Sequence, residues 1–342
     1  MKTTSISTLS LSRAMQSTVT SSQSQISSLE NEAVSGTYDD VGLALGVKTS
    51  QSLDYNNESN RLQAIVDSNS VASQRMDSSQ LALTQMSSNG QTLLDSLVAL
   101  TGSSDESTLK VSADQATAVL NSFQSYANSS SNGEYLFSGI NTDVQPLADT
   151  FVDDVTSDFN TSLDSYMSAN GVASASDMTS DQMTAFLSDY TTNFDWSSYT
   201  NASDTTMTSR ISTSESAQTS TSLNTDGFKN LVLSSVITSQ LATAGLSSDA
   251  LTAVNATTTN LAGQAISGIN LQASTLGLSQ QSVEDASTAL KSQQTIISTQ
   301  LNDLTGVDTY EASVKLNTLL TQVETSYSIT SKISQLSLVN YL

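Results

Sequence analysis

Residues 62–100, LQAIVDSNSVASQRMDSSQLALTQMSSNGQTLLDSLVAL, contain the pattern that decides the fold. Apolar residues recur at alternating steps of three and four, which gives the average period of about 3.5 residues that is typical of a coiled coil. Nine of the twelve stripe positions are apolar. We therefore predict a long helix that packs against another helix through Leu62, Ile65, Asn69, Ala72, Met76, Ser79, Leu83, Met86, Gly90, Leu93, Leu97 and Leu100.

The C-terminal part of the chain carries a matching stripe. Gly306 interrupts this stripe, and a weaker one lies near the N-terminus, from Leu11 to Ala33. Each stripe is too long to be buried by its own hairpin, so we predict that the two ends pack together as one antiparallel bundle. The C-terminal positions are Val283, Ala286, Leu290, Ile297, Leu301, Leu304, Ala312, Leu316, Leu319, Val323 and Ile333.

The middle of the chain differs in composition from both ends. Residues 111–209 contain no Lys or Arg but thirteen acidic residues, and twelve of the eighteen aromatic residues lie between 123 and 199. Asn132-Gly133 is a strong tight-turn signal, and residues 205–225 favour strands. We predict a mainly α protein, a long antiparallel coiled-coil bundle of N- and C-terminal helices that carries an inserted α+β outer domain with an aromatic core.

We therefore expect the chain to have three parts. Residues 1–141 form the N-terminal half of the bundle, residues 142–226 the acidic, aromatic-rich insertion, and residues 227–342 the C-terminal half. Within the first part we expect a terminal helix and loop, long helices and a hairpin, at 1–48, 49–129 and 133–141.

The composition excludes several classes of function. The 342 residues include no histidine and no cysteine, which excludes a Ser-His-Asp triad, a thiol nucleophile and a Cys/His zinc site. The net charge of −22 repels nucleic-acid phosphates and anionic lipid head groups. No apolar run approaches the roughly 18 residues of a membrane span. We expect no enzyme activity, no cofactor, no metal site, no nucleic-acid partner and no membrane insertion.

Hydroxyl side chains dominate the predicted helix surfaces, since the chain has 67 Ser and 44 Thr. Each lowers helix stability by about half a kcal/mol relative to Ala, so we expect the terminal helices to gain order by packing against neighbouring subunits. The residues predicted to serve subunit packing and assembly are Leu62, Ile65, Met76, Leu83, Met86, Leu93, Leu97, Leu100, Val283, Leu290, Ile297, Leu301 and Leu304.

Three clusters invite a more specific reading that we do not adopt. Asp153, Asp154 and Asp158 lack the ligand spacing of an EF-hand loop, which favours a solvated acidic face. Asp39-Asp40 is typical of a helix N-cap and loop hydrogen bonds rather than a catalytic dyad. Trp196, with Phe194 and Tyr199, favours a packed core over a sugar-stacking platform.

Three stretches resemble the flagellin superfamily of bacterial flagellar axial proteins. Ser35–Asp40 is similar to the loop with glycine and paired aspartates that follows the first helix in that family. Leu304–Ala312 resembles the acidic break before its last helix, and Leu336–Leu342 resembles its apolar tail. The resemblance covers residues 1–142 and 227–342.

A fourth stretch resembles one branch of this superfamily. Gly133–Thr142, read as GEYLFSGINT, is similar to the G-x-Y-x-F-x-G segment of hook–filament junction proteins, the third hook-associated proteins. Gly42–Gly46 resembles the α-proteobacterial members of that branch. The alternatives are flagellin itself, the filament subunit, and another exported coiled-coil structural protein.

The resemblance implies a structural protein of the bacterial flagellum, in a junction ring between hook and filament on which flagellin assembles. Its partners would be further copies of itself, a hook-side junction protein, flagellin and a cytosolic export chaperone. The protein would lie outside the cell after type III export, for which residues 1–12 would serve as an uncleaved signal. Residues 1–8 have no apolar core of the kind found in a cleavable signal peptide. The candidate chaperone contacts are Leu316, Leu319, Leu320, Val323, Ile333 and Leu336.

Overall fold

The computed structural model describes the backbone of residues 8–101 and 105–339 and, within those ranges, the side chains of residues 10–332. The chain divides into two compact units. The first joins Met1–Ala64 to Leu290–Leu342, and the second is Ile65–Ala289. The long helices α3 (Thr49–Ala99) and α8 (Ser248–Thr305) each contribute to both units.

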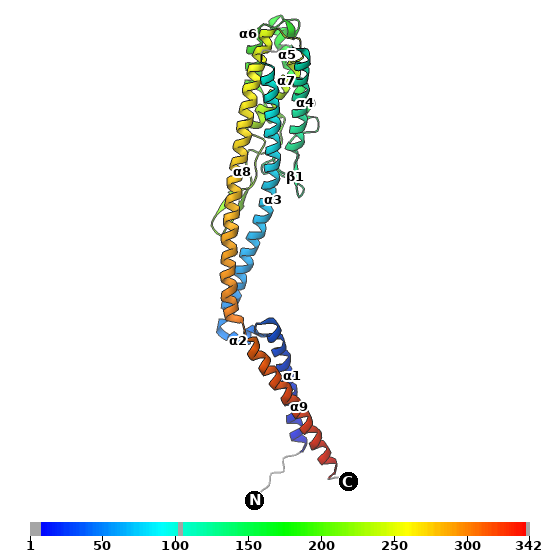
Figure 1. Ribbon diagram of the computed structural model, residues 1–342, viewed down its shortest axis with the longest axis vertical. Helices are drawn as coiled ribbons and strands as arrows, with labels where there is room; N and C mark the ends of the chain where they lie inside the picture. The colour runs from blue at the N-terminus through cyan, green and yellow to red at the C-terminus, as the bar shows by residue number, and fades with distance from the viewer. Residues whose placement is uncertain (1–7, 102–104, 340–342) are drawn as a thin grey trace. The chain divides into compact units, whose positions relative to one another are not determined.

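In the first unit, the terminal helices α1 (Thr8–Ser35) and α9 (Thr309–Val339) lie side by side (Figure 1). Gln23 of α1 donates a hydrogen bond of 3.1 Å to the hydroxyl of Tyr327 on α9. This pairing is the expected one between the two ends of the chain, and the mainly α fold is confirmed.

The loop after α1 pairs with the break between α8 and α9. The Tyr38 amide donates to the Thr305 carbonyl at 3.0 Å, and the Val307 amide donates to the Gly36 carbonyl at 3.0 Å. Gly36 has φ +74°, a conformation that glycine adopts without strain. The predicted loop and the predicted break are therefore one structural feature, held together by backbone hydrogen bonds.

The loop is shorter than the sequence indicated. The short helix α2 (Val41–Leu45) begins where a loop was expected, and η1 (Gly46–Lys48) follows it. Asp40 is the N-cap of α2, because its Oδ1 accepts a hydrogen bond of 2.8 Å from the Leu43 amide. Asp39 accepts from the Asn31 side chain at 2.8 Å. The predicted N-cap is confirmed for Asp40, and Asp39 makes a hydrogen bond from the loop.

In the second unit, α3 and α8 run antiparallel beside each other (Figure 1). Gln280 donates to Asp77 at 2.6 Å and Ser87 donates to Asn270 at 2.8 Å, so residue numbers rise along one helix as they fall along the other. The remaining helices of this unit are α4 (Glu106–Ala127), α5 (Phe151–Asn170), η2 (Ala175–Asp177), α6 (Ser180–Asn193), η3 (Trp196–Ser198) and α7 (Asp226–Leu241).

Two short antiparallel hairpins complete the second unit. β1 (Ser130–Ser131) and β2 (Glu134–Tyr135) are joined by Asn132-Gly133, both at positive φ, as a two-residue hairpin turn requires. β3 (Thr208–Arg210) pairs with β4 (Ser216–Gln218) inside the stretch predicted to form strands. Both sequence-based expectations are confirmed.

The aromatic core is larger than the sequence indicated. The insertion has the aromatic core that we predicted, since rings such as Phe159 and Tyr190 pack against each other. This core also extends beyond the insertion, because Phe123 of α4 lies 6.2 Å from Phe151, 6.4 Å from Trp196 and 6.1 Å from Phe228, measured between ring centroids. One hydrophobic cluster includes residues of α3, α4, α5, α6, α7 and α8. The insertion therefore shares its core with the helices, and the boundaries at 142 and 226 stay sequence-based predictions.

Candidate assembly surface

The predicted coiled-coil stripe forms the interior of the chain. Nine of the thirteen candidate packing residues are buried, and in this conformation they are not available to another copy. Ile65, Ile297, Leu301 and Leu304 are partly exposed, so a role between subunits stays a prediction for these four. The buried nine are Leu62, Met76, Leu83, Met86, Leu93, Leu97, Leu100, Val283 and Leu290.

Asn69, one of the polar interruptions of the stripe, connects α3 to the β3–β4 hairpin and to α8. Its Nδ2 donates to the Ile211 carbonyl at 2.9 Å and to the Ser287 hydroxyl at 3.0 Å. Its Oδ1 is buried without a partner among the described residues. The two hydrogen bonds of Nδ2 can form at only one register of α3 against α8, so Asn69 selects that register. The unpartnered Oδ1 lowers the stability of the fold.

Arg75 connects α3 to the segment that resembles the junction proteins. Its Nη1 lies 2.6 Å from Glu134 Oε2, and its Nη2 donates to the Tyr135 carbonyl. The Arg75 side chain is 8% exposed, whereas that of Glu134 is 53% exposed. Burial lowers the pKa of Arg75, and the nearby Glu134 carboxylate opposes that shift. The β1–β2 hairpin is therefore fixed to the long helix by a charged pair and a backbone contact.

Exposed apolar side chains on α8 are the assembly candidates that the periodicity missed. Leu271 is 64% exposed and Leu278 is 73% exposed, and their spacing of seven residues places them on one face of the helix. Apolar residues outside the main stripe of the same helix are the sequence signal that could have found them. Others exposed in the same way are Leu53, Val71, Leu81, Val98 and Ile296.

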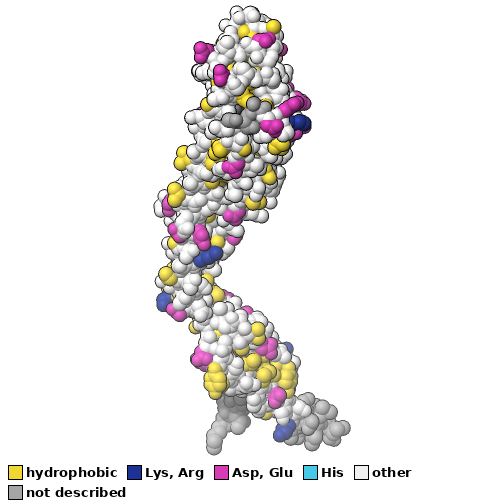
Figure 2. Space-filling view, turned by 45° about the horizontal axis from the view of Figure 1, so that its top comes forward, with side chains coloured by type: hydrophobic (Ala, Val, Ile, Leu, Met, Phe, Trp, Pro, Cys, Tyr) yellow, Lys and Arg dark blue, Asp and Glu magenta, His cyan; other side chains and the backbone are white. Residues whose placement is uncertain are grey.

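The surface of the chain is mostly uncharged, since charged residues make up 13% of the sequence. Figure 2 shows hydrophobic side chains scattered among uncharged polar ones, with more acidic than basic side chains on this face. Such a surface needs little charge desolvation when it contacts another protein. It suits helix-to-helix contact between copies of an assembling protein.

The first unit has a shallow hollow of about 470 Å³ between α1 and α9. Leu29, Glu32, Val314 and Leu319 are among its lining residues. Of the candidate chaperone contacts, Leu316, Leu319 and Val323 are partly exposed and Leu320 is exposed. The side chains of Ile333 and Leu336 lie outside the described residues.

Comparison with protein families gives two matches in chain order. Residues 6–142 match the bacterial flagellin N-terminal helical region, and residues 259–342 match the bacterial flagellin C-terminal helical region. Together they cover more than half of the chain. The chain belongs to the flagellin superfamily. A search of curated proteins found no match.

Membership in this superfamily makes the chain a structural protein of the bacterial flagellum, with a role in motility, an extracellular location and the capacity to assemble into flagellar polymers. The family points to a structural, non-enzymatic protein. The resemblance noted in the loops after the first helix and before the last is confirmed at this level. The C-terminal match begins at residue 259 and not at 227, so α7 lies outside both matched regions.

The structure also bears on the aromatic and acidic clusters for which the sequence allowed a ligand-binding interpretation. Trp196 and Phe194 are buried, and Trp196 Nε1 donates to the Leu223 carbonyl at 3.1 Å, so the packed-core reading of these two residues is confirmed. The described residues contain no group of three or more acidic side chains arranged to hold a metal ion, Asp153 and Asp154 included. In the described part of the chain, no helix combines the length and the apolar character needed to cross a membrane.

Proposed function

We propose that this chain forms the junction ring between hook and filament, on which flagellin assembles. The observation that carries the proposal is the segment Gly133–Thr142, which resembles the junction branch and ends where the N-terminal family match ends. Arg75 holds the start of this segment against α3 through Glu134 and Tyr135. A segment fixed in this way can mark the end of the helical part and the beginning of an outer domain.

In this proposal, copies of the chain contact one another, a hook-side junction protein and flagellin. The terminal helices α1 and α9 form the inner wall, and the residues between the two family matches, 143–258, supply the outward domain and α7. The exposed Leu271 and Leu278 add apolar contacts between copies. Export follows the flagellar type III route, with a cytosolic chaperone that covers the C-terminal helix near Leu320.

The second candidate is flagellin itself, the filament subunit. It is favoured by the descriptions of the two matched families, which are those of flagellin terminal regions. Another exported coiled-coil structural protein is a weaker candidate, because the paired terminal matches would then have no explanation.

Deletion of the gene separates the candidates, with flagellin assayed in the culture supernatant and hooks examined by electron microscopy. For a junction protein, the deletion strain makes hooks without filaments and releases monomeric flagellin. For a filament subunit, secreted flagellin falls instead, and any filaments consist of another subunit. Unaffected flagella would reject both and favour the third candidate.

A further inference from the structure

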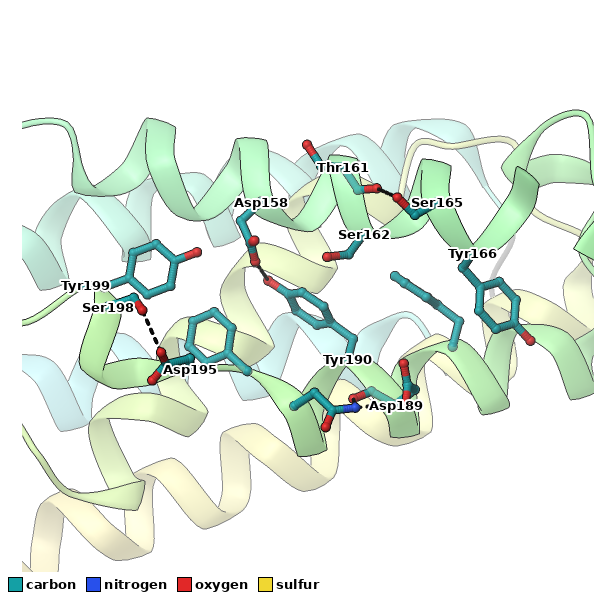
Figure 3. Close-up of a pocket in the computed structure, with 13 residues that line it drawn as sticks. Asp158, Thr161, Ser162, Ser165, Tyr166, Asp189, Tyr190, Asp195, Ser198 and Tyr199 are labelled. Carbon is teal, nitrogen blue, oxygen red and sulfur yellow. Dashed lines mark hydrogen bonds between the residues drawn. The ribbon is translucent and has the colours of Figure 1, made fainter. Parts of the chain in front are cut away.

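The second unit contains a pocket that the assembly role leaves unexplained. A cavity of about 520 Å³ lies among α5, α6 and the η3 turn, in the middle region of the sequence (Figure 3). Its volume falls in the range of about 300–1,000 Å³ that is usual for small-molecule sites. The residues that line it are aromatic, acidic or small and polar.

The pocket is negatively charged. Asp158, Asp189 and Asp195 line it, and none of its described lining residues is basic. The sequence has no Lys or Arg anywhere between residues 111 and 209. A positive charge that would neutralise these carboxylates therefore has to come from outside this part of the chain.

The three carboxylates differ in their hydrogen bonds and in their burial. Asp195 accepts short hydrogen bonds of 2.6 Å from both Ser197 and Ser198, as the cap of η3. Asp189 accepts from Asn193 at 2.9 Å. Asp158 has a longer contact, 3.4 Å to the Tyr190 hydroxyl, and its carboxylate points toward Tyr190 in Figure 3. The charge of Asp158 also acts on Tyr199. Of the three carboxylates, Asp158 is the one that is partly buried, whereas Asp189 and Asp195 are exposed, so a cation beside Asp158 would be the most desolvated.

Aromatic rings line the same pocket as Asp158 and are held in fixed orientations. Phe194 and Tyr199 are stacked, with ring centroids 5.3 Å apart and planes inclined by 11°. Phe186 and Tyr190 are stacked at 6.0 Å and 25°. The face of an aromatic ring attracts a cation, by about 0.5–2 kcal/mol according to how far the cation is desolvated.

The tyrosines add polar contacts without adding charge. Burial, followed by the charge of Asp158, raises the pKa of both Tyr190 and Tyr199, the latter to about 12. Both hydroxyls therefore stay neutral near physiological pH. The carboxylates alone set the charge of the pocket.

We propose that this pocket binds an organic cation, an ammonium or guanidinium group on a short aliphatic chain, with Asp158 as its charge partner and Tyr190, Phe194 and Tyr199 as its aromatic wall. Free polyamines and basic side chains of a peptide share this chemistry. This site goes beyond the proposed junction function, since ring assembly requires no small ligand.

Titration of the purified full chain tests the site, with cadaverine as the polyamine probe, pentanediol as its neutral analogue, and acetyl-lysine amide and acetyl-arginine amide as probes for a peptide source. Binding is followed by calorimetry and by the fluorescence of Trp196, the single tryptophan, whose ring lies 6.3 Å from that of Phe194. We expect saturable binding of at least one cationic probe, at least about tenfold tighter than that of pentanediol. The probe that binds tightest identifies the source.

Asp158→Asn is the decisive variant, because it removes the charge and keeps the shape. Asp164→Asn is its matched control, since Asp164 is an exposed residue on the same helix that does not line the pocket. We expect about a tenfold loss of affinity in the first and no change in the second. Tyr199→Leu tests the aromatic wall independently and is expected to weaken binding as well.

The proposal is wrong if no cationic probe binds saturably or if pentanediol binds as tightly as cadaverine. Equal losses of affinity in Asp158→Asn and Asp164→Asn would also overturn it, because they would reflect the overall charge of the chain. So would unchanged binding in Tyr199→Leu. None of these outcomes bears on the junction function, which is read from filament formation.

Discussion

Gly227 of α7 and Gly268 of α8 bring the two helices into backbone contact. A Cβ atom on Gly268 would lie 2.6 Å from Gly227 Cα, and one on Gly227 would lie 2.8 Å from the Gly268 carbonyl carbon. Real Cβ atoms do not approach backbone so closely, so glycine is required at both positions. The contact fixes α7, which lies outside both family matches, against α8, which carries much of the C-terminal match.

Gly268→Ala is therefore expected to destabilise the second unit by about 1–3 kcal/mol, the usual cost of overpacking a close helix contact. Gly263→Ala is the matched control, since a Cβ atom at Gly263 would meet nothing within 4 Å. In this helix interior the control is expected to gain up to about 1 kcal/mol. Urea unfolding of both variants measures the difference, and equal stability of the two would contradict the close contact.

Arg75→Met tests the connection between the hairpin and α3. It leaves the Tyr135 carbonyl and Glu134 without their partner, and we expect a loss of about 1–3 kcal/mol in the free energy of unfolding. Arg61→Met removes an exposed ion pair with Glu58 on the same helix and is expected to change stability little. An equally small change in the free energy of unfolding of both variants would contradict the stabilising role of the Arg75 contacts.

High pH is expected to destabilise the second unit through Tyr190 and Tyr199. The pKa of Tyr190 and that of Tyr199 are raised in the folded state above the value of about 10 in an unfolded chain, so folding favours the neutral form of these two residues. The resulting stability is fully present below pH about 10 and is lost as pH rises toward the folded pKa of Tyr199, about 12.

Alkaline unfolding curves of the wild type, Tyr190→Phe and Tyr310→Phe measure this effect. The first variant removes a buried tyrosine, and we expect it to flatten the loss of stability at high pH. Tyr310 is an exposed residue of α9, and its replacement is the control. An unchanged alkaline transition in Tyr190→Phe would show that Tyr190 is not the group that titrates on unfolding.

Substitutions at exposed residues of α8 distinguish an effect on assembly from an effect on folding. Replacing Leu271 and Leu278 together by Ser removes exposed apolar groups, so the stability of the subunit is expected to change by no more than about 0.5 kcal/mol for each. Swimming and filament formation are expected to fall. Leu276→Ala, at a buried position between them, is expected instead to cost about 2–5 kcal/mol. Normal motility in the double variant would exclude this face from assembly.

The sequence was sufficient for the parts of the fold that depend on local periodicity. The stripe from Leu62 to Leu100 predicted α3, and Asn132-Gly133 predicted the hairpin turn. The aromatic core was not predictable in the same way, because Phe123 and Phe228 meet across more than a hundred residues and neither position belongs to a long repeat. No local sequence pattern indicated that Phe123 and Phe228 would be in contact.

The assembly surface was harder to predict than the fold for a related reason. Periodicity finds the side of a helix that is buried, and here most of that side packs within the chain itself. The surface that we propose for contact between copies consists of exposed residues such as Leu271 and Leu278, and single apolar residues on a polar face form no repeat. The pocket beside Asp158 escaped notice because its walls come from two helices and a turn whose arrangement the sequence does not state.

The most direct test of the junction proposal is to locate the chain on intact flagella. An epitope tag in the exposed turn after α5, at Gly171, would be placed where a side chain has open space. Immunogold electron microscopy of a motile tagged strain would then show where the subunits lie. If the chain is the junction protein, we expect label only at the boundary between hook and filament. Label along the whole filament would contradict the junction proposal and identify the chain as a filament subunit.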